Sequence, residues 1–317
     1  MELQKLGLLG HIRELYARGG NIIEYLKGSG APEHNTPEDI LISYDFQAGS
    51  YIRDYRADPR LQEQYSTLVA RELDALGRCS SIIEAGCGDA TTLGTLVQHL
   101  ALKPRFILGF DISWSRIKFA RAFLKDIGVA DVHLFVGDLF SMPLPDNSVD
   151  IVLTSHAIEP NTGKEKEALA ELYRVARRYV VLLEPSYEFA GDMARTRMKE
   201  HGYITELLAS AQALGYTIIK HELLDMVWNP LNPTALMIIK KEGEGGVTSP
   251  ATKPQLVCPV TKTALVPVDG ALYSPESFLA YPVIGGTPCM IPTQAILATH
   301  LLDSVSDDIQ KRDTDRS

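Results

Sequence analysis

The order of apolar and polar positions between residues 80 and 184 predicts strands that alternate with helices. Short apolar runs rich in branched residues occupy 80–86, 105–112, 131–138, 148–155 and 178–185. Helical periodicity, with apolar residues three to four apart, occupies 91–101, 113–128 and 163–177. Nearly continuous apolar strands joined by helices are typical of a parallel sheet that is covered on both faces.

The pattern continues to residue 241 and predicts the remainder of the sheet. Residues 203–214 have helical periodicity, and 216–225 and 234–241 read as two further strands. The fold class expected is therefore α/β, a Rossmann-like, mostly parallel sheet of seven strands with helices on both faces.

The two ends of the chain differ from this alternating region. Helical periodicity in 4–18 and 60–76 predicts helices near the start of the chain, and a run rich in Gly, Ser and Pro follows residue 241. We expect five parts: a helical N-terminal cap (1–60), a central domain (61–242), a linker (243–253), a small α+β module (254–298) and a polar tail (299–317).

Composition and charge exclude several classes of protein. The 317 residues are 45% hydrophobic and 22% charged, which is ordinary for a globular protein, and no apolar run is long enough to span a membrane. The net charge of −9 argues against a nucleic-acid partner. The start of the chain lacks the features of a signal peptide, and the four cysteines form no C-x-x-C pair. We therefore expect a cytoplasmic protein without a membrane span.

A glycine-rich turn follows the first apolar run and opens the next helix. The segment Glu84-Ala85-Gly86-Cys87-Gly88-Asp89 has two glycines that let the backbone turn tightly and approach a ligand. Ligands of open α/β sheets bind beyond the carboxyl ends of the strands. By itself this turn leaves open both a dinucleotide site and a plain strand-to-helix turn. A nicotinamide site favours a third glycine, where this chain has Thr91.

An acidic residue ends the second strand of the pattern. Asp111 follows Glu84 by 27 residues and is placed to accept hydrogen bonds from both hydroxyls of a ribose. The alternative is that Asp111 only caps the helix that follows. Further along come Gly137-Asp138-Leu139 and a strand that leads into Thr154-Ser155-His156.

These motifs in this order resemble class I methyltransferases that depend on S-adenosylmethionine. The resemblance covers about residues 40–240 and includes the final strand motif L-L-E-P at 182–185. It implies S-adenosylmethionine as cofactor, S-adenosylhomocysteine as product and a Rossmann-like fold. The fourth strand lacks an N-P-P-Y or D-P-P-Y ending, which argues against adenine N6 or glutamine amides as acceptors.

The resemblance also implies a role for each matching residue. Residues 84–88 would line the methionine part of the cofactor, Asp111 would hold the ribose and Ile112 would pack on the adenine. The remaining cofactor-binding residues that it implies are Gly137, Asp138 and Leu139 at the adenine, and Thr154 and Ser155 near the reactive methyl group.

Two tyrosines before the core extend the resemblance. Tyr44 and Tyr51 match a Y-D-x-x-A-x-x-Y pattern in which an N-terminal helix closes over the cofactor. They are seven residues apart, so on one helix they would share a face. The alternative, two core tyrosines on an ordinary helix, stays equally open.

Catalytic candidates lie after the fourth and fifth strands. His156, Glu159 and Glu184 are the residues that we expect near the acceptor, and Tyr187 is a further candidate. A histidine at this place is able to deprotonate a hydroxyl near neutral pH. The alternatives are that His156 only shapes the pocket and that Glu184 is structural.

Residues 254–298 resemble a small zinc-ribbon-like family that activates other methyltransferases. Cys258-Pro259-Val260 and the run from Leu279 to Pro292 carry this resemblance. Thr261 stands in the place of the second cysteine and Ser274 lies near the next, so we expect no metal. The module is then either a stabilising appendage or an aid in recognising a macromolecule.

Taken together, the sequence predicts a methyltransferase acting on a small polar acceptor, with an oxygen of a sugar-like or carboxylated metabolite as the expected target. Two alternatives stay open. One is methylation of tRNA or a protein with help from the C-terminal module, and the other is a non-catalytic adaptor that binds the cofactor. The sequence leaves open whether the protein is a homodimer.

Overall fold

The computed structural model describes residues 3–27, 35–226, 229–242 and 253–303. Its centre is a seven-stranded sheet in the order β3-β2-β1-β4-β5-β7-β6. Six strands run in one direction, and β7 runs antiparallel to them. The strands are β1 (Ser81–Ala85), β2 (Phe106–Asp111), β3 (Val132–Val136), β4 (Val149–Ser155), β5 (Ala176–Pro185), β6 (Thr217–Leu223) and β7 (Thr234–Lys240). This arrangement confirms the predicted fold class.

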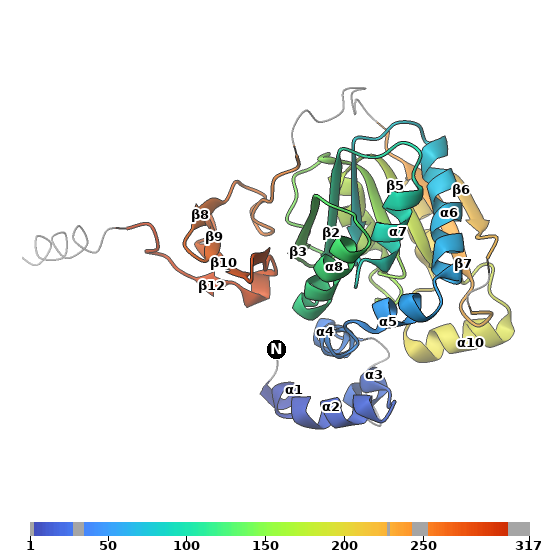
Figure 1. Ribbon diagram of the computed structural model, residues 1–317, viewed down its shortest axis with the longest axis horizontal. Helices are drawn as coiled ribbons and strands as arrows, with labels where there is room; N and C mark the ends of the chain where they lie inside the picture. The colour runs from blue at the N-terminus through green and yellow to red at the C-terminus, as the bar shows by residue number, and fades with distance from the viewer. Residues whose placement is uncertain (1–2, 28–34, 227–228, 243–252, 304–317) are drawn as a thin grey trace, which may run out of the picture.

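Helices pack on both faces of the sheet (Figure 1). One face carries α6 (Arg60–Ala75), α7 (Thr91–His99) and α8 (Trp114–Asp126), and the other carries α9 (Glu165–Val175) and α11 (Leu207–Ala213). The predicted helices and strands of this region are confirmed, although α11 begins four residues later than expected. The sheet has its topological switch point between β1 and β4, where ligands of such folds bind.

The helix α10 (Asp192–His201) was not predicted from the sequence. Its sequence is mostly polar, and its buried residues are Ala194 and Met198 alone, so it lacks the apolar stripe from which a helix is predicted. It lies beside the carboxyl ends of the strands, in the lower right of Figure 1.

The N-terminal cap is helical, as expected, but it is divided. It consists of α1 (Leu3–Gly7), α2 (Leu9–Ala17), α3 (Ile22–Lys27), α4 (Pro37–Phe46) and α5 (Ser50–Ala57). The prediction that Tyr44 and Tyr51 share one helix is wrong. The helix breaks before Gly49, whose φ of 86° is in the left-handed region that suits glycine, and the two tyrosines lie on α4 and α5.

The C-terminal module is an antiparallel sheet rather than α+β. Its strands are β8 (Val266–Val268), β9 (Ala271–Ser274), β10 (Leu279–Ile284), β11 (Thr287–Pro288) and β12 (Ile296–Leu297). A single 3-10 turn, Pro292–Gln294, lies between β11 and β12. Residues 253–303 contain no α-helix. Residues 243–252 of the expected linker (243–253) and residues 304–317 of the expected tail (299–317) lie outside the described residues.

The module docks on β3, the edge strand of the large sheet. The Met290 amide donates to the Val136 carbonyl (2.8 Å), and the Val257 amide donates to the Pro143 carbonyl (3.0 Å). Lys262 Nζ donates to the Met142 carbonyl and pairs with Glu171 at 3.0 Å. The first bond pairs a backbone group at the end of the edge strand, and the others hold the module to the segment that follows β3.

Two absences can be stated for the part of the chain that the structure describes. It has no helix long and apolar enough to cross a membrane. It also has no group of three or more His, Cys, Asp or Glu side chains that would hold a metal ion.

Replacing Lys262 by methionine tests how firmly the module is docked. We expect Lys262→Met to lower the free energy of unfolding by about 1–3 kcal/mol, because the Met142 carbonyl and the Glu171 carboxylate each lose a charged donor. Urea unfolding measures this change. Lys125→Met, which removes an exposed cation from α8, is the matched control and should change stability by less than about 0.5 kcal/mol. Equal stabilities of the two variants would contradict the docking described above.

Replacing Gly86 by alanine tests the close packing at the switch point. A Cβ at Gly86 would lie 2.4 Å from the Cβ of Ala157, and the φ of Gly86 is 72°. Left-handed strain and overpacking together should therefore cost at least about 2 kcal/mol of unfolding free energy. Gly10→Ala is the control, because its added Cβ meets nothing within 4 Å. A Gly86→Ala protein as stable as the control would show that the two loops do not pack as described.

Candidate cofactor and acceptor site

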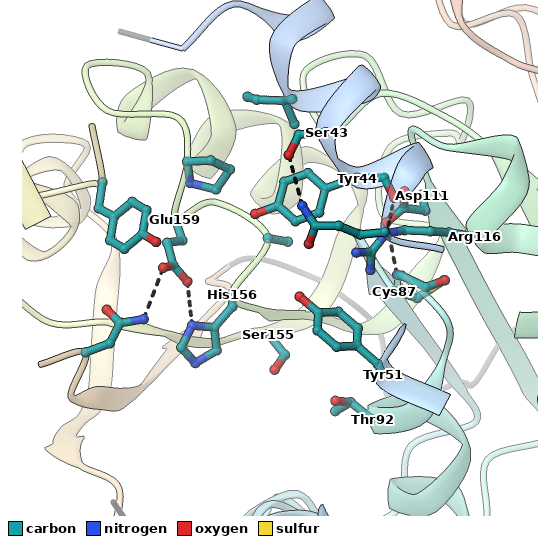
Figure 2. Close-up of a pocket in the computed structure, with 18 of the residues that line it drawn as sticks. Ser43, Tyr44, Tyr51, Cys87, Thr92, Asp111, Arg116, Ser155, His156 and Glu159 are labelled. Carbon is teal, nitrogen blue, oxygen red and sulfur yellow. Dashed lines mark hydrogen bonds and ion pairs between the residues drawn. The ribbon is translucent and has the colours of Figure 1, made fainter. Parts of the chain in front are cut away.

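A cavity of about 1160 Å³ opens at the carboxyl ends of the strands, beneath the N-terminal cap. It lies at the switch point between β1 and β4, and Figure 2 shows its polar side chains. The cavity brings together most of the residues singled out in the sequence: Tyr44, Tyr51, Glu84, Gly86, Cys87, Gly88, Asp111, Ile112, Gly137, Asp138, Leu139, Ser155, His156 and Glu159.

Four of the candidate residues do not line the cavity. Ala85 and Thr154 are fully buried in the sheet behind its wall. Glu184 is also buried and lies behind the turn that follows β4. Tyr187 packs against α10 in a separate small cluster.

Glu84 is a buried carboxylate with one oxygen, Oε2, that no described residue satisfies. It is 2% exposed, and its Oε2 has no hydrogen-bond partner. Burial raises the pKa of Glu84 well above its ordinary value, and the nearby Asp111 charge adds to this effect. An unsatisfied carboxylate at a cavity wall suits a ligand that brings a hydrogen-bond donor or a positive charge.

Asp111 is fixed in place by two backbone amides. Its Oδ2 accepts from Gly88 N at 3.0 Å, and its Oδ1 accepts from Ser113 N at 2.9 Å. Each carboxylate oxygen accepts more than one bond, so both keep capacity for ligand hydroxyls. Burial raises the pKa of Asp111, while Arg116 and the two amides oppose this rise.

The loop after β3 forms another wall of the cavity. Asp138 Oδ1 accepts from the Phe140 amide at 2.9 Å, and this bond leaves Asp138 Oδ2 available to a ligand. Leu139 and Phe140 are partly buried against the main core beside it. The arrangement offers a flat ligand one acceptor and an apolar surface.

The buried carboxylate of Glu184 organises the turn after β4. Its Oε1 accepts from the amides of Ala157 (3.0 Å) and Ile158 (3.2 Å), and its Oε2 accepts from the amide of Glu159 (3.1 Å). Burial raises the pKa of Glu184 to about 7. Glu184 thus positions the residues around His156 from behind and does not face the cavity.

His156 is held from both sides of its ring. Its Nδ1 lies 2.6 Å from Glu159 Oε2, and its Nε2 lies 2.9 Å from Thr234 Oγ1. Asn232 Nδ2 donates to the other oxygen of Glu159 at 3.0 Å. Figure 2 shows the His156–Glu159 pair at the cavity. The φ of His156 is 55°, a left-handed conformation that is costly and often found at functional sites.

Burial and the neighbouring carboxylates act in opposite directions on His156. Burial lowers the pKa of His156, but the charge and hydrogen bond of Glu159, together with Glu184, outweigh it and raise the pKa above 6.5. A carboxylate on Nδ1 favours the tautomer with its proton there, which leaves Nε2 as the basic nitrogen. The ring is therefore equipped to accept a proton at Nε2.

Several cavity residues were missed in the sequence. Arg116 stands among the buried positions of α8, and a cation within that apolar stripe was the available signal. Arg197 was missed together with α10, Tyr203 follows that helix, Asn232 precedes β7 and Thr234 begins it. No short motif marks these four residues.

The comparisons with known proteins agree with the architecture. Residues 82–179 match the methyltransferase domain family. A solved geranyl diphosphate methyltransferase superposes with a TM-score of 0.51 at 13% identity, covering 65% of this chain and 98% of that one, which is a likeness of fold.

Curated relatives match over parts of their length. A protein of transposon TN4556 from Streptomyces fradiae, described as uncharacterized, is 29% identical over 56% of this chain and 47% of its own. Ajmaline N-methyltransferase from Rauvolfia serpentina is 35% identical over 48% and 52%. Malonyl-[acyl-carrier protein] O-methyltransferase from Yersinia pestis is 34% identical over 32% and 34%. The chain thus spans between a third and about half of the length of these relatives. The likeness to the methyltransferase domain family is therefore a property of residues 82–179.

Proposed function

We propose that the protein transfers a methyl group from S-adenosylmethionine to a small polar acceptor, with an oxygen of a sugar-like or carboxylated metabolite as the target. The observation that carries the cofactor part is the orphaned Glu84 beside the Gly86–Gly88 turn. The cofactor brings an ammonium group, a ribose and an adenine. The cavity offers Glu84 for the first, Asp111 for the second, and Asp138 with Ile112 and Leu139 for the third.

The far side of the cavity supports a polar acceptor. It is lined by Arg197, Tyr203, Asn232 and Thr234 around the His156–Glu159 pair. Arg197 Nη1 and Asn232 Oδ1 are buried and have no hydrogen-bond partner, so a donor and an acceptor there are both available to a substrate. A hydroxyl group suits Asn232 Oδ1, and an acidic group suits Arg197.

The proposed chemistry needs alignment and one proton acceptor. When bound, the cofactor supplies a methyl group on a positively charged sulfur. A bond forms between the acceptor oxygen and the methyl carbon as the bond from that carbon to sulfur breaks. His156 takes the hydroxyl proton at Nε2 after the substrate displaces the Thr234 hydroxyl, and Glu159 stabilises the resulting imidazolium.

The relatives differ in the acceptor atom. One relative is named for transfer to oxygen and another for transfer to nitrogen. The choice of oxygen rests on the His156–Glu159 pair, because a hydroxyl must lose its proton whereas a neutral amine attacks without prior deprotonation.

The first test is binding of S-adenosylmethionine and S-adenosylhomocysteine by calorimetry. We expect micromolar affinity for both, and in Asp111→Asn a loss of about 10- to 100-fold, because a charged acceptor of the ribose hydroxyls is gone. Asp150→Asn is the matched control. Asp150 is also a buried carboxylate that accepts backbone amides, from Ser80 and Ser81, but it lies outside the cavity. A wild-type protein that binds neither compound would contradict the proposed function.

The pH dependence of turnover tests His156 as the base. The neutral imidazole is the active form, so kcat/KM should rise with pH through a midpoint above 6.5, the ordinary value, because the His156 pKa is raised. In Glu159→Gln the midpoint should move to lower pH, because the carboxylate that raises the His156 pKa has been removed. The acceptor found by screening serves as substrate for both proteins. Identical midpoints in the two proteins would exclude His156 as the base.

A further inference from the structure

Arg116 is the largest of the fully buried side chains in the part of the chain that the structure describes. It is 2% exposed, comes from the first turn of α8 and lines the cavity next to Asp111. A fully buried guanidinium is rare unless a charge partner is present, because its desolvation costs several kcal/mol.

The guanidinium group ties two helices of the cap to the cavity. Its Nε donates to the carbonyl of Tyr44 on α4 at 2.9 Å. Its Cζ lies 4.9 Å from the ring centre of Tyr44 and 4.7 Å from that of Tyr51 on α5. Figure 2 shows both rings beside Arg116. Cation–π contacts of this kind attract the two rings to one charge, so Arg116 holds both cap helices.

One nitrogen of the guanidinium, Nη2, has no hydrogen-bond partner among the described residues. Nη2 is buried without a hydrogen-bond partner, and among the described residues no carboxylate forms an ion pair with Arg116. The two nearby acids are engaged elsewhere: Asp89 accepts from Gly49 N, and Asp111 accepts from Gly88 N and Ser113 N. Against the opposing effect of burial, the charges of Asp111 and Asp89 raise the pKa of Arg116. Neither acid accepts a hydrogen bond from Nη2, so this donor is available to an anionic ligand.

The approach of Arg116 to the glycine turn is built into the sequence. A Cβ added to Gly88 would lie 2.7 Å from Arg116 Nη1, so a side chain there would displace the guanidinium. The guanidinium group, of which Nη2 is a part, therefore lies next to the segment that would receive the amino-acid part of the cofactor.

The ligand chemistry follows by elimination. The amino-acid part of S-adenosylmethionine has an ammonium group and a carboxylate. Glu84, as an acid, suits the ammonium and repels the carboxylate, and Asp111 suits the ribose hydroxyls for the same reason. A guanidinium presents parallel N–H donors that match a carboxylate in one plane. Arg116 is the buried cation near the glycine turn, and its free arm is unpaired.

We propose that Arg116 binds the carboxylate of the cofactor and thereby couples cofactor binding to closure of the cap by Tyr44 and Tyr51. The inference rests on S-adenosylmethionine being the cofactor. It assigns to one side chain both the recognition of the amino-acid end and the anchoring of α4 and α5.

The test compares S-adenosylmethionine with its decarboxylated analogue, which lacks only the carboxylate. By calorimetry we expect the wild-type protein to bind S-adenosylmethionine about 10- to 100-fold more tightly, the range for one charge-assisted hydrogen bond. In Arg116→Gln this preference should fall to within about twofold. In Arg116→Lys it should fall but persist, because one ammonium group does not replace the planar fork.

Lys118→Gln is the matched control. It removes the same charge from the same helix, at an exposed position outside the cavity, and should keep the wild-type preference. Tyr51→Leu removes one ring from Arg116 and should weaken binding of S-adenosylmethionine more than binding of its analogue, because cap closure is coupled to the carboxylate. If Arg116→Gln fails to fold, the lysine variant decides the matter.

Hydrogen exchange gives a second readout that a purely structural arginine would not change. In the wild-type protein S-adenosylmethionine should protect the amides of α4 and α5 more than its decarboxylated analogue does, and Arg116→Lys should reduce this difference. A wild-type protein that binds both compounds equally well, or an arginine variant with undiminished preference, would overturn the role of Arg116 while leaving the cofactor in place. Failure of the wild-type protein to bind either compound would instead overturn the proposed function and this inference with it.

Discussion

Burial of carboxylates at one edge of the sheet is the constraint on which the rest of the site depends. The strands β1, β2 and β5 each carry an acid at their carboxyl ends, Glu84, Asp111 and Glu184. Such groups are costly unless hydrogen bonds replace the lost water. Glu184 meets this requirement with three backbone amides, and those bonds fix the turn that carries His156. Asp111 meets it with two amides, one of which belongs to the glycine turn. Glu84 has one oxygen without a hydrogen bond, and this oxygen belongs to a residue that lines the cavity.

The cap is attached by the same principle. Asp45 accepts from Ser113 Oγ and from the amide and hydroxyl of Ser115, and so joins α4 to the start of α8. Asp89, from the glycine turn, accepts from Gly49 N at the break between α4 and α5. Asp45, the acid of the Y-D motif, therefore attaches the cap to α8. Tyr44 and Tyr51 lie on different helices and both pack on Arg116. Cap and glycine turn share polar partners, so a change in one is transmitted to the other.

The sequence was sufficient for the sheet and for most of the cavity wall because both follow from local pattern. Apolar strands of about five residues and helices of period 3.6 are read from spacing alone. The failures have physical causes. Adjacent residues of a strand point to opposite faces, so a motif that spans Glu84 and Ala85, or Thr154 and Ser155, supplies one cavity residue of each pair. The break at Gly49 depends on a tertiary contact, since a Cβ there would meet the Phe119 ring at 2.9 Å. The partners of the His156–Glu159 pair lie far away in the sequence: Thr234, which begins β7, contacts His156, and Asn232, just before β7, contacts Glu159.

The small C-terminal module can be judged by what it touches. Cys258, Tyr281 and Met290 belong to the same buried cluster as Phe135 of β3 and Leu172 of α9, so module and large domain share one core. Its hydrogen bonds reach Val136, Met142 and Pro143, and these residues flank the loop that carries Gly137, Asp138 and Leu139. A part that shares a core and holds both ends of a loop lowers the freedom of that loop before any ligand arrives. These contacts join the module to the wall of the cavity that carries Asp138, whose Oδ2 is available to a ligand.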